Sequence, residues 1–214
     1  MKLIIGNKNY SSWSLRPWLM LKQLGLAFDE IYVSLYAPGY KQRILQYSPS
    51  GKVPCLIDED VTVWDSLAIG EYLAEKHPSL WPVDPKARAL ARSISAEMHA
   101  GFTRLRQHMP MNIRKNYAGK GHTPEVDADI ARIVALWQDC RARYGAGGPF
   151  LFGQFTIADA MYAPVCFRFM TYAVAPEGAA GDYLRTMLAL PAMQEWQAAA
   201  EAEAESIPEE DRYG

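Results

Sequence analysis

The chain has 214 residues, and its charges nearly balance, with 22 Lys and Arg against 24 Asp and Glu. The net charge of −2 gives no electrostatic basis for binding nucleic acid or an anionic membrane surface. Half of the residues are hydrophobic, which is enough for a sizeable core, yet no apolar run approaches the roughly 18 residues that cross a membrane.

Strand and helix signals alternate through the first part of the chain. Met1–Gly6 is too short and too quickly polar for a signal peptide, and it is typical of a first strand over residues 3–6. Gly25 suits the end of a first helix over residues 14–24. The pattern continues with a strand over 28–35, a weaker helix over 40–47, a hairpin over 53–57 and 61–64, and a helix from Ser66. This order predicts a thioredoxin-like α/β domain over residues 1–80.

A proline-rich linker follows, and strand signals then vanish. Three prolines cluster between residues 78 and 85. Helical patterns cover residues 87–116, 125–143, 156–172, 183–190 and 192–206. Thr156 and Asp159 fit a capping box at the start of the third of these helices. We expect Glu201–Glu205 to be a solvated helix end and Pro208–Gly214 to be loose. Residues 86–214 are therefore predicted to form an all-α domain.

A short motif in the hairpin region carries the most specific signal. Proline cannot donate to a β-ladder, so Val53-Pro54 must lie at a strand's first residue, an edge or a bulge. Asp65 and Ser66 then open the next helix. The pairing resembles the glutathione-binding half of the cytosolic glutathione S-transferases, where a valine and a cis-proline start the third strand and an acidic residue and a serine open the following helix.

The loop Tyr10–Arg16, between the first strand and the first helix, is suited to thiolate chemistry. Ligands of open α/β sheets bind at the carboxyl ends of strands, and a helix N-terminus favours an anion. A free thiol has a pKa of about 8.5, and lowering it by ~2 units requires about 2.7 kcal/mol of preferential thiolate stabilisation. One charge-assisted hydrogen bond contributes roughly 1.5–3 kcal/mol, so a single hydroxyl with the helix end suffices.

The resemblance selects one hydroxyl in this loop. In the serine-type transferase classes the catalytic serine lies fourteen positions before the glycine that ends the first helix, which implies Ser11. Ser12 is the second candidate, and Ser14 is expected to be the helix N-cap. The alternative is that all three are ordinary loop and capping serines. Residues 11–16 also resemble the zeta class, which includes maleylacetoacetate isomerases, although Trp13 stands where that pattern has cysteine.

The resemblance also implies where glutathione is held. Its cysteinyl backbone can pair like an added strand with Val53, with a cis bond at Pro54 turning the peptide groups outward. The γ-glutamyl carboxylate suits the start of the Ser66 helix. The other implied contacts are Asp65 to the γ-glutamyl ammonium, and Lys52 and Lys41 to the glycyl carboxylate. Lys52 is alternatively a solvated turn lysine.

The remaining signals are weaker. An acceptor pocket between the two domains is the expected place for the second substrate, although aromatic and Met residues at helical spacing are more often core. The candidates are Tyr10, Trp13, Phe102, Arg106 and Met109. The four histidines share no metal-ligand spacing, so we expect no metal. Three widely spaced cysteines indicate no disulfide framework and fit a reducing cytoplasm.

These observations predict a cytoplasmic detoxification enzyme that takes glutathione as co-substrate, activates its thiol as a thiolate and directs it to a small electrophile. The alternatives are a glutathione-dependent isomerase of the maleylacetoacetate isomerase type and a non-catalytic glutathione-fold binding protein. A thiol–disulfide oxidoreductase would need a cysteine in the active loop, and residues 1–51 have none. Members of the family are usually homodimers, so we expect a homodimer, with no nucleic acid or membrane partner.

Overall fold

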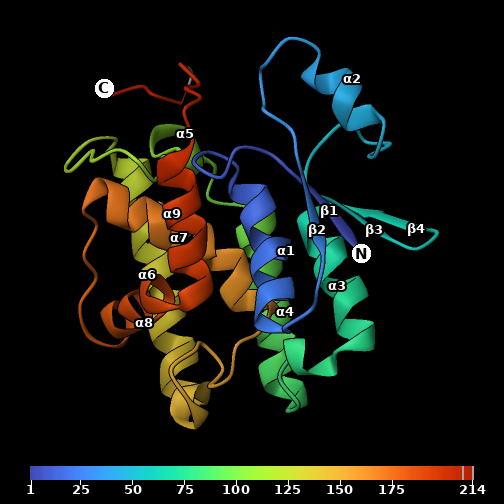
Figure 1. The fold of residues 1–214 in the computed structure, drawn as a ribbon. Helices are drawn as coiled ribbons and strands as arrows, with labels where there is room; N and C mark the ends of the chain where they lie inside the picture. Colours follow the sequence, from blue (N-terminus) through green and yellow to red (C-terminus); the bar gives the residue numbers. More distant parts are fainter. Residues whose placement is uncertain (209, 214) are drawn as a thin grey trace.

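The computed structural model describes residues 1–208 and 210–213 of the chain. A four-stranded mixed sheet with its helices forms the first part, and a helical assembly forms the rest (Figure 1). The strands are β1 (Lys2–Ile5), β2 (Asp29–Tyr32), β3 (Cys55–Asp58) and β4 (Val61–Trp64), in the order β2-β1-β3-β4. β1 is parallel to β2 and antiparallel to β3, and β3 is antiparallel to β4. The predicted thioredoxin-like domain followed by an all-α domain is confirmed.

The helices of the first part are α1 (Ser12–Gln23), α2 (Tyr40–Leu45) and α3 (Ser66–Lys76). Those of the second part are α4 (Pro85–Ala100), α5 (Thr103–His108), α6 (Pro124–Tyr144), α7 (Ile157–Tyr172), α8 (Gly178–Ala189) and α9 (Pro191–Ala202). Two short 3₁₀ turns, η1 (Pro78–Leu80) and η2 (Gly145–Gly147), complete the described elements.

The period-2 pattern of β1 divides its side chains between two hydrophobic clusters. Leu3 and Ile5 belong to the large core that α1, α3 and the C-terminal helices share, whereas Ile4 faces the opposite side of the sheet. There it packs with Val33, Ile44 of α2 and Cys55. Cys55 is fully buried.

Helix α1 is buried between the sheet and the C-terminal helices. Every residue from Ser14 to Leu21 is buried, and the helix contacts α3 on one side and α7 and α9 on the other (Figure 1). One contiguous core therefore spans both parts of the molecule.

The predicted single helix over residues 87–116 is wrong, because α4 ends at Ala100 and a turn separates it from α5. Phe102 adopts a left-handed φ of 54°, and α5 begins at Thr103. A Cβ at Gly101 would lie 2.7 Å from the Glu97 carbonyl oxygen, so this turn requires glycine. The Asp129 carboxylate accepts a hydrogen bond from the Leu105 N–H at 3.0 Å and satisfies an early amide of α5.

The predicted loose tail is also wrong for residues 208 and 210–213; residues 209 and 214 lie outside the described residues. Tyr213 donates to the His108 carbonyl at 2.8 Å, and its ring packs against Tyr117. The acidic stretch before it is not simply solvated either. The Glu203 carboxylate accepts hydrogen bonds from the Lys8 and Asn9 N–H groups, and it thereby fastens the end of the chain to the loop after β1.

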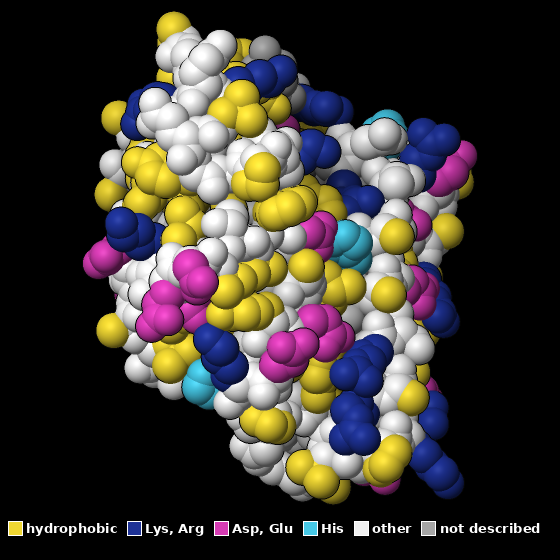
Figure 2. Space-filling view, turned by 90° about the vertical axis from the view of Figure 1, so that its right-hand side faces the viewer, with side chains coloured by type: hydrophobic (Ala, Val, Ile, Leu, Met, Phe, Trp, Pro, Cys, Tyr) yellow, Lys and Arg dark blue, Asp and Glu magenta, His cyan; other side chains and the backbone are white. Residues whose placement is uncertain are grey.

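The surface shows no dominant charge on the side where β4 and α3 lie. Figure 2 shows acidic, basic and hydrophobic side chains intermingled on this face. Val61 and Trp64 of β4 are 41% and 46% exposed. None of the helices that the structure describes has both the length and the apolarity needed to cross a bilayer.

The predicted capping box at α7 is present and fully buried. Asp159 accepts hydrogen bonds from the Thr156 N–H at 2.8 Å and the Thr156 hydroxyl at 3.0 Å. Its other oxygen accepts from the Leu151 N–H at 3.1 Å. Burial raises the pKa of Asp159 to about 6, although these hydrogen bonds favour the charged form.

We predict that the double variant Thr156→Ala, Asp159→Ala folds but is less stable by about 2–4 kcal/mol. Loss of the cap costs ~1 kcal/mol, and the buried Leu151 N–H left without a partner costs roughly 1–3 kcal/mol more. Urea denaturation measures this, and the affinity for glutathione should not change. Thr123→Ala is the matched control, because Thr123 caps the exposed start of α6 without a buried acid and should cost only ~1 kcal/mol. Equal losses in the two variants would contradict this account of the box.

We also predict a pH dependence that belongs to Asp159. Its pKa is higher in the folded state than in the unfolded state, so its contribution to stability is full below pH ~4 and is lost as the pH rises through about 6. The stability of the wild type relative to Asp159→Asn should therefore fall by up to about 3 kcal/mol between pH 4 and 6.5, since one pKa unit equals 1.36 kcal/mol. Urea denaturation at constant ionic strength tests this. Parallel stability curves would show that Asp159 titrates normally.

Candidate active site

The loop after β1 ends at the N-terminus of α1, and Ser11 rather than Ser14 caps that helix. The Ser11 Oγ accepts from the Ser14 N–H at 3.4 Å, so the predicted capping role of Ser14 is wrong. The helix starts earlier than predicted because the Ser11 N–H bonds back to the Asn7 carbonyl at 2.8 Å and tightens the loop. Ser14 is instead fully buried, and its hydroxyl accepts from the Gly6 N–H at 3.1 Å.

The hydroxyls of Ser11 and Ser14 are hydrogen-bonded to each other. Their oxygens lie 2.7 Å apart, and either hydroxyl can be the donor. The Gly6 N–H donates to the Ser14 oxygen. In the arrangement in which Ser14 donates to Ser11, the Ser11 hydroxyl can donate its own proton to a ligand, and each bond polarises the next.

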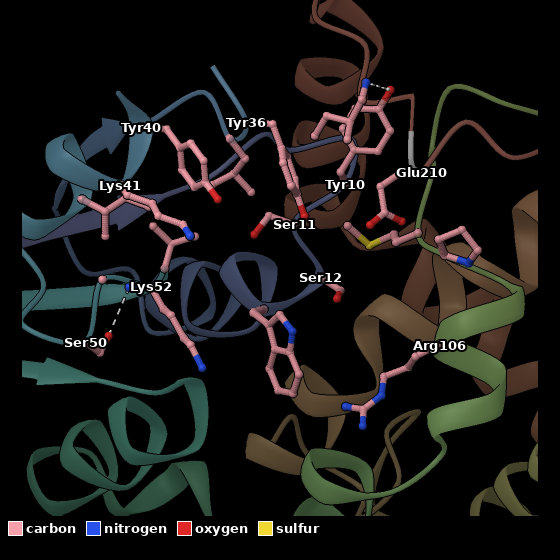
Figure 3. Close-up of a pocket in the computed structure, with 18 of the residues that line it drawn as sticks. Tyr10, Ser11, Ser12, Tyr36, Tyr40, Lys41, Ser50, Lys52, Arg106 and Glu210 are labelled. Carbon is pink, nitrogen blue, oxygen red and sulfur yellow. Dashed lines mark hydrogen bonds between the residues drawn. The ribbon is translucent and has the colours of Figure 1, made fainter. Parts of the chain in front are cut away.

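A cavity of about 800 Å³ lies in front of this loop. One wall comes from residues 35–36, α2 and residues 50–53, and the other comes from α5, residues 110–111, α7 and the tail. The Ser11 hydroxyl points toward the side where Tyr40, Lys41 and Lys52 lie, whereas the Ser12 hydroxyl points toward Arg106 (Figure 3). The two serines thus face different halves of one cavity.

A second cavity of about 500 Å³ adjoins the first along the start of β3. It shares Trp13, Ser50, Lys52 and Val53 with the first cavity, and Pro54, Trp64, Asp65, Ser66 and His99 complete its lining. The Val53–Pro54 bond is cis, as expected. All the residues predicted to contact glutathione therefore line one or both cavities: Lys41, Lys52, Val53, Pro54, Asp65 and Ser66.

Asp65 and Ser66 are held at the start of α3 by partners that the sequence did not indicate. Asp65 has a φ of 76°, and its Oδ1 accepts from the Leu67 N–H at 2.8 Å. Its Oδ2 lies 3.2 Å from the His99 Nε2, while the side chain remains 44% exposed. The Ser66 hydroxyl accepts from Arg16 Nη1 at 3.4 Å and is nearly inaccessible, at 1% exposure for the residue.

The predicted acceptor residues separate into two groups. Tyr10, Trp13 and Arg106 line the larger cavity. Phe102 and Met109 do not, because the break before α5 turns both into the core, where they are 7% and 0% exposed. Their place in the lining is taken by residues that sequence reasoning missed: Pro110, Met111, Arg168, Ile207 and Glu210. Pro110 was the one available signal, since proline ends a helix before it.

Tyr10 has a structural role in this wall of the cavity. Its hydroxyl donates to Asp211 at 3.1 Å and accepts from Arg114 at 2.9 Å and from the Ile207 N–H at 3.2 Å. The tail is thereby attached to the loop that carries Ser11.

Buried positive charge distinguishes the half of the cavity that Arg106 and Arg168 line, where the acceptor is predicted to bind. Burial lowers the pKa of Arg16 to about 9 and that of Arg168 to about 10, and the neighbouring guanidiniums contribute to both shifts. Burial also lowers the pKa of Arg106. The Trp13 ring lies 4.4 Å from the Arg16 guanidinium carbon and 5.4 Å from that of Arg106. The Trp13 ring therefore makes cation–π contacts with two of the three arginines.

The described residues offer neither a reactive cysteine nor a group of metal ligands. Cys55, Cys140 and Cys166 are free and buried, and burial raises the pKa of each thiol, to about 12 for Cys140. Reactive cysteines are exposed and have depressed pKa values. The described residues contain no group of three His, Cys, Asp or Glu that could hold a metal ion.

Family models match both parts of the chain. Residues 10–76 match the glutathione S-transferase N-terminal domain, and residues 120–199 match the C-terminal domain. A probable maleylacetoacetate isomerase of Caenorhabditis elegans is 34% identical over 162 residues, which are 73% of this chain and 72% of that protein. A stringent starvation protein A homologue of Pasteurella multocida is 28% identical over 80% of this chain and 76% of its own length.

Solved structures show the same fold. A glutathione transferase homologue from Burkholderia, with bound glutathione, aligns with a TM-score of 0.67 and 23% identity, covering 94% of this chain and 98% of that one. A tau class glutathione S-transferase from mango aligns with a TM-score of 0.70 and 20% identity, covering 94% and 95% of the two chains. The chain belongs to the glutathione S-transferase family.

Proposed function

We propose that this protein is a glutathione transferase in which Ser11 stabilises the glutathione thiolate for attack on an electrophile. The observation that carries the proposal is the position of Ser11 in the cavity lining, with a hydroxyl that can accept from Ser14 and donate its own proton to a ligand. The acceptor of that proton would lie at the N-terminus of α1, where the helix dipole also favours negative charge.

The free energy required is modest. A thiol with a pKa of about 8.5 needs roughly 2.7 kcal/mol of preferential thiolate stabilisation to be ionised at neutral pH. A charge-assisted hydrogen bond from Ser11 supplies roughly 1.5–3 kcal/mol, and the helix terminus typically adds about 0.3–1 kcal/mol. The thiolate then attacks an electrophile in the half of the cavity that Ser12, Trp13 and Arg106 line.

The rest of the tripeptide is assigned to the two joined cavities. The backbone of Val53 pairs with the cysteinyl residue, and Ser66 and the α3 N-terminus receive the γ-glutamyl carboxylate. Asp65 faces the γ-glutamyl ammonium, with His99 holding its second oxygen. Lys41 and Lys52, both exposed side chains on the cavity rim, receive the glycyl carboxylate.

Two alternatives have specific support. An isomerase of the maleylacetoacetate type is suggested by the name of the Caenorhabditis elegans relative and needs the same thiolate, which would add to the substrate and leave again. A non-catalytic glutathione-fold binding protein is the other, and a stringent starvation protein A homologue is among the relatives. Turnover with a generic aromatic electrophile separates an enzyme from a binding protein.

The buried free thiols suit a reducing compartment, and we propose that the protein acts in the cytoplasm, with detoxification as its role.

Ser11→Ala should lower turnover about 10- to 100-fold, because it removes one charge-assisted hydrogen bond to the thiolate. The pKa of the bound thiol should rise toward 8.5, seen as loss of thiolate absorbance at neutral pH. Affinity for glutathione should change little. Because Ser11 also caps α1, the variant should lose ~1 kcal/mol of stability, so the assays are run well below its melting temperature.

Ser12→Ala is the matched control for this experiment, since the Ser12 hydroxyl points to the other half of the cavity (Figure 3). It should retain the thiolate absorbance. If Ser12→Ala loses that absorbance and Ser11→Ala keeps it, Ser12 is the catalytic serine. If both keep it, serine chemistry is excluded.

We further propose a homodimer. Helix α4 leaves little apolar surface for an interface, because its main apolar residues are buried within the chain: Ala87, Ala91, Ile94 and Met98. The support comes from β4, an edge strand of the sheet that exposes Val61 and Trp64. Light scattering at micromolar concentration should give twice the 24.0 kDa chain mass, and Trp64→Glu should shift the protein to monomer. A monomeric wild type would refute the proposal.

A further inference from the structure

Two arginines, Arg106 and Arg168, line the acceptor half of the cavity, and a third, Arg16, lies against the ring of Trp13. Arg16 of α1 and Arg168 of α7 are 2% and 4% exposed. Arg106 of α5 completes the group, which we call the arginine cluster. Among the described residues, no carboxylate oxygen lies within 4 Å of a nitrogen of any of the three. Buried charges are normally paired, so this cluster requires an explanation.

The hydrogen bonds of the cluster leave most of its donors free. Arg168 donates from Nε to the Met109 carbonyl at 2.8 Å and from Nη1 to the Pro164 carbonyl at 3.4 Å. Arg106 donates to the His99 carbonyl at 3.2 Å. Arg16 reaches Ser66 at 3.4 Å, and its Nε is buried without any partner. Each guanidinium has five N–H donors in a fork that matches a carboxylate.

The charge of the cavity is not cancelled locally. Glu210 lines the same half, but its attraction is the smallest of the influences on the pKa of Arg168, which burial and Arg106 lower to about 10. Asp65 attracts Arg16 in the same limited way, and the pKa of Arg16 still falls to about 9. Lys41 and Lys52 lie across the cavity, on the other side of Ser11 (Figure 3). They are therefore available to the glycyl carboxylate, and Ser66 with the α3 N-terminus serves the γ-glutamyl carboxylate, so Arg106 and Arg168 are not needed for glutathione.

We infer that the acceptor half binds an electrophile that carries a carboxylate, held by Arg106 and Arg168 with Arg16 behind Trp13. The inference rests on the proposed transferase function and adds a substrate class to it. Both Arg106 and Arg168 line the cavity, and Ser12 lies between Ser11 and Arg106 (Figure 3). A carboxylate on the cluster would leave the remainder of a small electrophile directed back toward the thiolate.

A pair of aromatic electrophiles that differ only in charge tests this. In 4-chloro-3,5-dinitrobenzoate and its neutral benzamide, the thiolate forms the C–S bond, the C–Cl bond breaks and chloride leaves, and the thiol proton passes to solvent. After division by the uncatalysed rates, kcat/KM of the wild type should favour the benzoate at least 10-fold. Arg106→Met should reduce that preference about 10- to 100-fold, chiefly through the KM for the benzoate.

Two further variants distinguish an effect of the arginine charge on substrate preference from an effect on folding. Arg104→Met is the matched control, because Arg104 lies on the same helix, is exposed and does not line the cavity; activity and preference should persist. Arg168→Lys keeps the charge of a buried site but loses the fork, and it should reduce the preference less than Arg106→Met does. A benzoate preference that survives both Arg106→Met and Arg168→Lys would overturn the inference.

A binding measurement separates this inference from the proposed function. Calorimetry compares the glutathione conjugates of the benzoate and the benzamide on the wild type. Tighter binding of the benzoate conjugate, by at least 10-fold, supports the inference even if neither electrophile is turned over, in which case the transferase function alone fails. Equal affinity together with equal normalised kcat/KM refutes the carboxylate specificity and leaves the transferase function intact.

Discussion

The burial of α1 is the constraint from which the site follows. With every residue from Ser14 to Leu21 inside the molecule, the polar side chains of this helix must find partners in the interior. Ser14 finds the Gly6 N–H and Ser11, and Arg16 finds Ser66 and the face of Trp13. These contacts therefore fix the loop that bears Ser11 against the end of β1 and the start of α3.

The two parts of the chain contribute different chemistry to one cavity. The α/β part supplies backbone groups, helix N-termini and hydroxyls, which suit a constant ligand such as a tripeptide. The helical part supplies Arg106, Arg168 and the segment around Met111, which line the other half of the cavity. Function varies within a fold through such local residues, so the family alone does not name the electrophile.

Local features were predictable from sequence, whereas features that depend on distant contacts were not. The proline at the start of β3, the opening of α3 and the α7 capping box are each encoded within four residues, and the structure has all three. The break before α5 depends on Asp129, which is far along the chain, and the ordering of the tail depends on Tyr10. The arginine cluster was invisible for a similar reason: periodicity shows that a residue is buried, not that its counter-charge is missing.

The attachment of the tail has a consequence for the order in which the site is assembled during synthesis. Glu203 and Asp211 bind Asn9 and Tyr10, across about 200 residues of chain. At translation rates of 5–20 residues per second, roughly 10 to 40 s separate the emergence of the loop from that of its last partners. The loop that bears Ser11 therefore lacks its carboxylate anchors until the last residues emerge. A nascent or prematurely terminated chain would also lack the part of the cavity wall that Ile207 and Glu210 supply.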